Sequence, residues 1–393
     1  MSAALPEESA SGGSANAPSA EQSGNSASAG PRSLRALLRL PVVQAPMAGG
    51  AATPELAAAV SGAGGLGFLA AGYKTPEAMY EQIRAVRRLT RQPFGVNLFV
   101  PPASPHPSGH GGETPAAVEL YREQLAGEAR WYDTALGDPE QGTDDAYDGK
   151  LAVLREHPVP VVSFAFGCPS AQTLRSLSER GMLTVVTVTS VAEAQAAQRA
   201  GADTLCVQGI EAGGHQSTHH DDPYAEGAGV GLLSLIGQVH ETVPLPLIAA
   251  GGLMRGGQIA AALAAGAAAA QLGTAFLPCP ESGAHPLHKR SLTDPLFART
   301  ELTRAFSGRP ARGLVNRFMR EHGPYAPAAY PQVHHLTAGV RKAAAAAGDA
   351  QGMALWAGQG HRLARTLPAA ELVALLAEEV EAARTGLLGG QAS

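Results

Sequence analysis

The sequence predicts an α/β protein built as a (β/α)₈ TIM barrel, with an insertion after strand 3 and a C-terminal helical accessory layer. Eight short apolar runs alternate with Ala-rich segments of helical periodicity. Continuous apolar runs are typical of parallel strands that helices cover on both faces. A single barrel of this class needs about 250 residues, whereas the chain has 393. The additional length is therefore expected in the tails, the insertion and the accessory layer.

The predicted strands are rich in Val, Ile, Leu and Phe and are bounded by Gly, Pro or polar turns. A doubly wound sheet is the alternative architecture. It is disfavoured because the first strand leads into Ala48-Gly49-Gly50 and not into the GxGxxG turn of a dinucleotide-binding sheet. The eight strands are expected at 42–47, 66–70, 94–100, 161–166, 183–189, 204–208, 245–250 and 269–276.

Local signals mark where the intervening helices begin and end. Thr53-Pro54 and Thr75-Pro76 place a capping residue before a proline at the first helical position. Ser190 and Glu193 have the spacing of a capping box. Glycines follow or close several helices, as left-handed C-caps require. The predicted helices include 54–63, 76–89, 170–180, 191–200 and 255–265.

Four segments are predicted along the chain. Residues 1–33 are Ser/Ala/Gly-rich with few large apolar side chains, which is typical of a disordered tail. Residues 34–290 form the barrel, interrupted at about 101–150 by a Pro/Gly/His-rich loop, a helix at 116–136 and an acidic, turn-rich stretch. Residues 291–386 form a helical region over the active site, and 387–393 a flexible terminus. The accessory helices are expected at 296–305, 311–322, 336–347 and 367–385.

Composition excludes several classes of protein. The chain has 29 Lys+Arg and 34 Asp+Glu, a net charge of −5, which argues against a nucleic-acid or acidic-membrane partner. No apolar run is long enough to span a bilayer. Three widely separated cysteines form no zinc-binding pattern and suit a reducing compartment, so no metal and a cytoplasmic location are expected.

The chemistry of a barrel lies where strands end and helices begin. The seventh and eighth strands end in Gly251-Gly252 and Gly273-Thr274. Glycine lets backbone N–H groups approach phosphate oxygens, and loops after these two strands commonly bind phosphate. Each pair alone fits a tight turn. Two pairs on adjacent strands favour a phosphate site.

Four amide side chains accompany the same strand ends, namely Gln44, Asn97, Gln208 and Gln271. A buried amide without a partner costs roughly 1–3 kcal/mol. Four of them at one end indicate a shared polar ligand, and the carbonyls and ring nitrogens of an isoalloxazine match such groups. The alternative is that each amide satisfies neighbouring backbone, which is favoured more for Gln44 than for Gln208.

His215 closes the segment Glu211-Ala-Gly-Gly-His215 after the sixth strand. Histidine can accept a proton or stabilise an anion near neutral pH, and the flanking glycines allow close approach to a ligand, so a catalytic role is predicted. The group His219, His220, Asp221 and Asp222 is interpreted as a polar surface loop and not as a metal site. The same solvated interpretation is given to His285/His288 and His334/His335. Tyr325 and Tyr330 are candidates for the substrate side of the site.

These motifs resemble the nitronate monooxygenase family, formerly called 2-nitropropane dioxygenases, and its class I in particular. QAPMAGG (44–50), GVNLF (95–99), VVSFAFG (161–167), TVTS (187–190), QGIEAGGH (208–215), AAGG (249–252) and QLGTAF (271–276) occur in the family's order, and the resemblance covers about 34–386. It implies a noncovalent FMN, with His215 as the catalytic residue. It also implies that FMN contacts Ala45, Pro46, Met47, Ala48, Asn97, Gln208, Gly213, Gly214, Gly251, Gly252, Gln271, Leu272, Gly273 and Thr274.

The resemblance implies oxidation of an alkyl nitronate, typically propionate 3-nitronate, by O₂ to a carbonyl compound and nitrite, in a detoxifying role. Two alternatives stay open. One is an FMN-dependent enoyl-acyl carrier protein reductase using NAD(P)H, against which Pro46 and the long C-terminal region argue. The other is a non-catalytic flavin-binding barrel, which does not need His215. The preferred nitronate and the oligomeric state are not determined by the sequence.

Overall fold

The computed structural model describes residues 33–101, 115–142, 144–221 and 229–389. The predicted tail at 1–33 lies almost wholly outside these residues. So do most of the Pro/Gly/His-rich loop that begins at 101, Asp222, and the end of the predicted flexible terminus.

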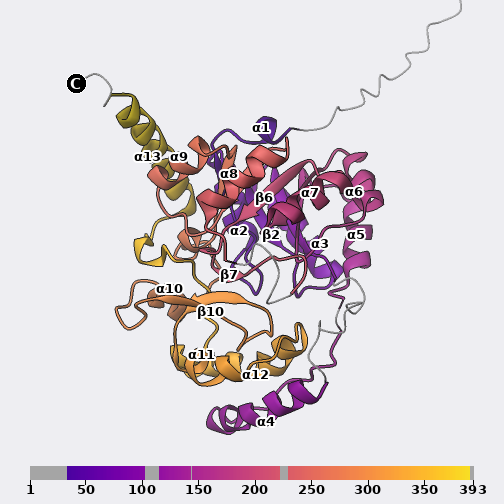
Figure 1. The fold of residues 1–393 in the computed structure, drawn as a ribbon, viewed down its shortest axis with the longest axis vertical. Helices are drawn as coiled ribbons and strands as arrows, with labels where there is room; N and C mark the ends of the chain where they lie inside the picture. Colours follow the sequence, from indigo (N-terminus) through magenta and orange to yellow (C-terminus); the bar gives the residue numbers. More distant parts are fainter. Residues whose placement is uncertain (1–32, 102–114, 143, 222–228, 390–393) are drawn as a thin grey trace, which may run out of the picture. The chain divides into compact units, whose positions relative to one another are not determined.

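Eight parallel strands form the barrel, as the sequence predicts (Figure 1). The hydrogen-bonded order is β1-β9-β8-β6-β5-β4-β3-β2, so strands consecutive in the barrel are neighbours. The first and last strands are shorter than predicted, because β9 gives way after Leu272 to a 3₁₀ turn at Thr274–Phe276. The barrel strands are β1 Val42–Gln44, β2 Gly67–Ala70, β3 Phe94–Phe99, β4 Val161–Ala165, β5 Leu183–Val188, β6 Thr204–Gln208, β8 Leu247–Ala250 and β9 Ala269–Leu272.

The ring of strands closes between β1 and the residue that precedes β2. Val43 and Leu66 form a parallel bridge. Leu66 N donates to the Val42 carbonyl at 3.0 Å, and Gln44 N donates to the Leu66 carbonyl at 2.9 Å. All barrel strands therefore point their carboxyl ends toward the same side of the molecule.

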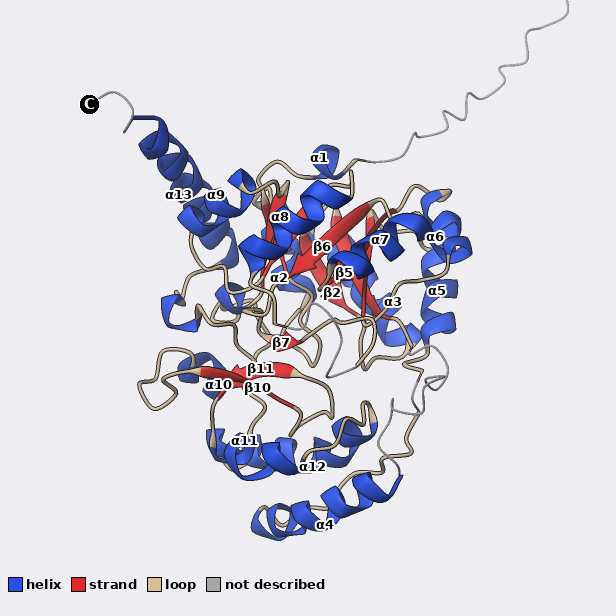
Figure 2. Ribbon diagram, in the orientation of Figure 1, coloured by secondary structure: helices blue, strands red, loops and turns tan. Residues whose placement is uncertain are grey.

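Helices cover the outside of the barrel (Figure 2). The predicted caps are present on α2, α3 and α7, where Thr53, Thr75 and Ser190 accept hydrogen bonds from backbone N–H groups. No helix among the described residues is long and apolar enough to cross a membrane. The α-helices up to the end of the barrel are α1 Leu34–Leu37, α2 Pro54–Gly62, α3 Pro76–Leu89, α4 Pro115–Trp131, α5 Tyr147–Glu156, α6 Ala171–Ser178, α7 Val191–Ala200, α8 Leu232–Thr242 and α9 Gly256–Ala264.

The insertion differs from its prediction in two ways. Its helix α4 ends at Trp131 rather than continuing to 136. The acidic stretch leads directly into a second helix, α5, which the turn-rich composition concealed. Asp145 anchors this stretch by accepting a hydrogen bond from Tyr73 N at 2.8 Å and by pairing with the buried Lys150 at 2.6 Å.

The C-terminal region is not wholly helical, so the helix predicted at 296–305 and the first part of the helix predicted at 311–322 are wrong. These stretches contain two antiparallel strands, β10 Thr300–Thr303 and β11 Ala311–Leu314. Arg, Ala and Leu favour helices weakly, and pairing with another strand overrides that preference. The remaining α-helices are α10 Pro286–Ser291, α11 Arg317–His322, α12 Gln332–Ala346 and α13 Ala369–Gly389.

A small second sheet joins the barrel to the accessory region. Its order is β10-β11-β7, and β7 is the two-residue strand Gly214–His215 that follows the sixth barrel strand. Ala311 pairs with His215 and Arg312 with Gly214. Figure 2 shows this sheet between the barrel strands and helices α11 and α12. The accessory region therefore supplies a strand that fixes the segment carrying His215.

The last helix does not cover the site. Helix α13 packs against α9 and α2, in the outer helical layer of the barrel. The contact is close because α9 begins with glycine. A Cβ at Gly256 would lie 2.3 Å from Glu379 Cβ, and Gly256 N donates to Glu379 Oε2 at 2.7 Å. Within the predicted accessory region, this helix belongs to the barrel wall.

We expect Gly67→Ala to destabilise the fold. The new Cβ would lie 2.1 Å from the Ala57 carbonyl oxygen, so α2 would have to move away from β2. Overpacking of this kind typically costs about 1–3 kcal/mol. Gly62→Ala is the matched control, because its Cβ would meet nothing within 4 Å. Urea unfolding monitored by circular dichroism measures both, and equal midpoints for the two variants would contradict this packing.

Candidate active site

One cavity of about 590 Å³ lies at the carboxyl ends of the barrel strands. Every residue that the resemblance assigns to cofactor binding or catalysis lines it, although the residues come from the ends of five barrel strands, β1, β3, β6, β8 and β9. Further walls come from α12 and from the segment around Trp356. The predicted residues that meet in this cavity are Ala45, Pro46, Met47, Ala48, Asn97, Gln208, Gly213, Gly214, His215, Gly251, Gly252, Gln271, Leu272, Gly273 and Thr274.

The accessory region holds both the backbone and the ring of His215. Its strand β7 pairs with β11, and the neighbouring Gln216 N donates to the Pro310 carbonyl at 2.8 Å. Its ring Nε2 lies 2.8 Å from the hydroxyl of Ser307, which precedes β11. Since backbone and ring are both fixed by the accessory region, the imidazole has a defined orientation toward the cavity.

Aromatic rings surround the half-buried His215. The ring centroids of Phe166, Tyr330 and Trp356 lie 5.6, 5.7 and 5.6 Å from that of His215. This burial lowers the pKa of His215 to about 3, and the nearby positive charges of Arg309 and Arg341 lower it further in the same direction. The imidazole is therefore neutral at physiological pH.

Phe166 occupies a strained backbone position at the end of β4. Its φ of +70° is uncommon for a residue other than glycine. The guanidinium of Arg309 lies over its ring at 4.3 Å, within cation–π range. Arg309 in turn donates to the backbone carbonyls of Gln216 and Thr218. This arrangement places a buried positive charge and a flat apolar face beside His215.

The two glycines that follow β8 adopt backbone conformations that favour glycine. Gly251 and Gly252 have φ of +142° and +67°. Thr274 lines the cavity, and its hydroxyl accepts a hydrogen bond from Gly358 N at 2.9 Å, so the hydroxyl hydrogen remains to donate to a ligand. These groups could hold a phosphate.

The two glycines before His215 are required for different reasons. Gly214 has a φ of +75°, and a Cβ there would meet nothing within 4 Å. A Cβ on Gly213 would lie 2.4 Å from Gly358 N, so this glycine is needed for the 357–358 backbone to pack against the strand end. Close approach to another part of the chain, as well as to a ligand, therefore explains this pair.

Two of the four amides are committed to backbone groups. Gln44 is fully buried and accepts from Phe68 N at 2.9 Å, which agrees with the structural alternative. Gln208 donates to the His215 carbonyl at 3.1 Å and accepts from Ser217 N at 2.8 Å. Gln208 therefore shapes the loop that presents His215, and it also lines the cavity.

Asn97 and Gln271 are less fully engaged. Asn97 donates to Ser163 Oγ at 2.9 Å, and Gln271 donates to Cys206 Sγ at 3.4 Å. No described residue donates a hydrogen bond to either side-chain oxygen. Both residues line the cavity, where these oxygens could accept from a ligand's N–H group.

The sequence interpretation missed several cavity residues on α12 and β2–α3. His334 and His288 were interpreted as solvated, but both line the cavity and burial lowers their pKa values to about 2 and about 4. The ring of His334 stacks on that of Tyr73 at 4.1 Å. The available signal was helical spacing, because His334, Ala338 and Arg341 share one face of α12.

The other polar residues that the sequence singled out differ in whether they lie near His215. Tyr330 contacts His215 and donates to the Tyr73 hydroxyl at 3.2 Å, whereas Tyr325 is exposed and lies away from the cavity. His219 is not merely solvated, since its Nε2 donates to the Thr187 carbonyl at 2.9 Å. Asp221 pairs with Arg304 at 2.6 Å.

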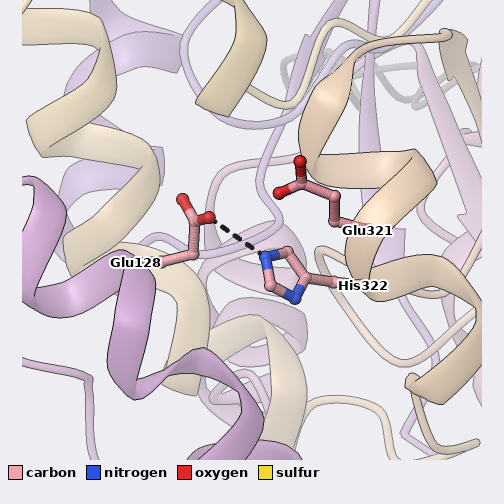
Figure 3. Close-up of side chains that lie close together, drawn as sticks. All are labelled: Glu128, Glu321 and His322. Atoms are coloured by element: carbon pink, nitrogen blue, oxygen red, sulfur yellow. Dashed lines mark hydrogen bonds and ion pairs between the residues drawn. The ribbon is translucent and has the colours of Figure 1, made fainter.

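One further cluster has the composition of a metal site. Figure 3 shows Glu128, Glu321 and His322 close together on α4 and α11. Arg317 donates to both carboxylates, at 2.5 and 2.7 Å, and thus supplies the positive charge that a metal would bring. His322 completes the network at 3.1 Å from Glu128. The cluster is therefore an ion-pair network that ties α4 to α11.

Comparison with known proteins agrees with this geometry. The nitronate monooxygenase family model matches residues 32–379. The nitronate monooxygenase of Pseudomonas aeruginosa is 41% identical over 351 residues, which are 87% of this chain and 97% of that protein. A solved structure of nitroalkane oxidase from Streptomyces ansochromogenes has a TM-score of 0.85 and 65% identity, over 89% of this chain and 98% of that chain.

FabK from Thermotoga maritima shares the fold at a TM-score of 0.67 and 29% identity, over 90% of this chain and 97% of that chain. Its identity is well below that of the nitroalkane oxidase, and the family model names nitronate monooxygenases. These matches support the nitronate prediction over the reductase alternative. The chain belongs to the nitronate monooxygenase family.

Proposed function

We propose that the protein is an FMN-dependent nitronate monooxygenase that uses O₂ to convert an alkyl nitronate to a carbonyl compound and nitrite. The observation that carries the proposal is the neutral, oriented His215 in the same cavity as the glycine-rich strand ends. A base and a candidate phosphate-binding site in one cavity suit an enzyme that binds a flavin nucleotide together with a small nitroalkane or its nitronate. Membership of the family supports the reaction class.

The residues present fit FMN. A cavity of about 590 Å³ lies within the usual range of roughly 300–1,000 Å³ for cofactor sites. Gly251, Gly252, Gly273 and Thr274 would hold the phosphate, and Asn97 and Gln271 offer polar contacts to a ring edge. When bound, the flavin supplies the redox chemistry between the nitronate and oxygen.

In this proposal His215 either accepts a proton from the substrate or stabilises the negative charge of the nitronate. The Ser307 hydroxyl has the Arg309 carbonyl as an acceptor at 3.2 Å. When it donates there, His215 Nε2 carries a proton toward Ser307 and Nδ1 keeps its lone pair, which can accept the α-proton of a neutral nitroalkane. With a preformed nitronate, the ring and the nearby positive charge of Arg309 stabilise the anion instead.

The aromatic rings around His215 exclude water from the reacting carbon. Phe166 is only 5% exposed, and Trp356 packs edge-on against Phe306 at 5.5 Å. In a dry site, hydrogen bonds and charges act more strongly on the substrate than they would in water. These residues therefore support a defined orientation of the nitronate.

Anaerobic mixing distinguishes the three functions. We expect propionate 3-nitronate alone to change the visible absorbance of the flavin-loaded protein, because the electrons come from the nitronate. NADPH alone should leave the spectrum unchanged. Bleaching by NADPH and not by the nitronate would contradict the proposal in favour of a reductase. A flavin that responds to neither would indicate a binding protein.

His215→Ala should retain bound flavin but lose nitronate turnover by roughly 10²–10⁴-fold, the usual contribution of a general acid–base group. The flavin is expected to stay because the phosphate-binding groups are on other strands. His240→Ala, on the exposed side of α8, is the matched control and should keep full activity. Nitrite release under air measures both, and an active His215→Ala protein would remove the catalytic assignment.

Acid should destabilise the protein partly through His215. Its pKa is lowered on folding, so below about pH 6.5 the unfolded chain binds a proton that the native chain does not. The stability from this group is therefore lost as pH falls from about 6.5 toward its folded value of about 3. Between pH 7 and pH 5 the loss is up to about 2 kcal/mol. Urea titrations at pH 7 and pH 5 measure the loss, and His215→Gln should lose less stability between these pH values than wild type. An equal loss in both proteins would indicate that folding leaves the pKa of His215 at its ordinary value.

A further inference from the structure

Tyr73 occupies a strained backbone position at the cavity. It lies in the loop between β2 and α3, lines the cavity and has a φ of +64°. A positive φ is unfavourable for a bulky aromatic residue, so it persists only where the surrounding structure imposes it. Residues held in this way cluster at active sites. Proton transfer by His215 does not use Tyr73, so its conformation needs another explanation.

The insertion after β3 holds the backbone of Tyr73. Asp145, which lies 72 positions further along the chain, accepts a hydrogen bond from Tyr73 N on its Oδ1 at 2.8 Å. Its other carboxylate oxygen lies 2.6 Å from Nζ of Lys150, whose side chain is 1% exposed. Asp145 cannot turn away from this position without leaving a buried ammonium unpaired, which is strongly unfavourable. The strained loop therefore has a rigid anchor.

The ring of Tyr73 is fixed as firmly as its backbone. It stacks on the ring of His334, with centroids 4.1 Å apart and an interplanar angle of 5°. The ring of Phe99 meets it edge-on at 5.4 Å. Its hydroxyl oxygen accepts a hydrogen bond from the Tyr330 hydroxyl at 3.2 Å. The phenol is therefore oriented before any ligand arrives.

The hydroxyl hydrogen of Tyr73 has no acceptor in the part of the chain that the structure describes. A phenol can accept one hydrogen bond and donate another. The bond from Tyr330 uses the oxygen as an acceptor and leaves the hydrogen of Tyr73 to donate. Burial raises the pKa of Tyr73 to about 12, so this hydrogen stays bound at physiological pH. A shielded donor without an acceptor is unfavourable, and an oxygen of a ligand in the cavity would satisfy it.

This donor belongs to the aromatic cluster around His215. The ring of Tyr330, which bonds to Tyr73, lies 5.7 Å from that of His215. Phe166 packs against both, at 5.4 Å from Tyr330 and 5.6 Å from His215. The positive charge of Arg309 acts on both Tyr73 and His215. The free hydrogen therefore lies at the reacting end of the cavity, in surroundings that favour an anionic oxygen.

We propose that the Tyr73 hydroxyl donates a hydrogen bond to an oxygen of the substrate's nitronate group and stabilises its negative charge while His215 acts on the adjacent carbon. The inference rests on the proposed function for the identity of that group. A hydrogen bond to an anionic oxygen is stronger than one between neutral groups, and a donor fixed in advance needs no reorganisation as the charge develops. Tyr73 is then a second catalytic residue, and Tyr330 is the positioning residue that orients it.

Binding and turnover test this proposal separately. Butyrate is an unreactive analogue of propyl-1-nitronate, because a planar carboxylate with two oxygens replaces the nitronate group. Calorimetric titration of the flavin-loaded protein measures its affinity for butyrate, and steady-state kinetics measures turnover of propyl-1-nitronate. The variants are Tyr73→Phe and Tyr330→Phe, singly and together. Tyr325→Phe is the matched control, because Tyr325 is 65% exposed and does not line the cavity.

Tyr73→Phe should weaken butyrate binding at least about tenfold, the range of a hydrogen bond to a charged group. It should lower kcat/KM for propyl-1-nitronate by at least about the same factor. Flavin content should stay unchanged, because phenylalanine keeps the ring stacked on His334. Tyr330→Phe should have a smaller effect, and none in a Tyr73→Phe background, because its hydroxyl acts through Tyr73. Tyr325→Phe should behave as wild type.

Three results would overturn the role of Tyr73: no binding of butyrate by wild type, equal affinities of wild type and Tyr73→Phe, or loss of flavin from that variant. Additive losses in the double variant would remove the positioning role of Tyr330. Absence of turnover with the nitronate would contradict the proposed function. The butyrate affinities would still decide whether Tyr73 binds an anionic oxygen, so the two failures are distinguishable.

Discussion

The pairing of β7 with β11 is the interaction on which the site depends. A two-residue strand after β6 would be a mobile loop on an isolated barrel, but Ala311 and Arg312 give it a backbone partner. The same connection places Ser307 against the imidazole of His215. Gly213 makes room for the 357–358 backbone that closes over this strand. Barrel and accessory region therefore build the catalytic position jointly, and neither supplies it alone.

The pairing also determines the electrostatics of the cavity. Because β11 and the residues before it enclose His215, the ring is shielded from water and kept neutral by burial and by Arg309. Arg309 is held by carbonyl oxygens rather than by a carboxylate, so its charge stays available to the cavity. In the proposed function, an anionic substrate would meet the positive charge of Arg309 at its reacting end.

The barrel and its strand-end residues could be predicted because their signals are local. Apolar runs, Thr-Pro caps and paired glycines each act within a few residues. The strands and helices that they predict place the predicted site residues around one cavity. The strand β11, and with it its neighbour β10, could not be found this way. Strand β11 pairs with β7, whose residues lie 96 and 98 positions earlier in the chain, and propensity does not encode a pairing over that separation. His334 and Arg341 were missed for a different reason. Helix α12 is amphipathic, and the sequence does not show whether its polar face meets solvent or a cavity. Gln208 matched its predicted place but is engaged with the His215 loop.

Hydrogen exchange measured by mass spectrometry on peptides that cover 213–217 tests the central claim most directly. The Gln216 and Ser217 amides donate to the Pro310 carbonyl and to Gln208 Oε1, both at 2.8 Å. We predict that they exchange at least about tenfold more slowly than unbonded loop amides, with kinetics that follow those of the β11 peptide. Rapid exchange of 213–217 beside a protected β11 would contradict the account, because His215 would then not be held by the accessory region.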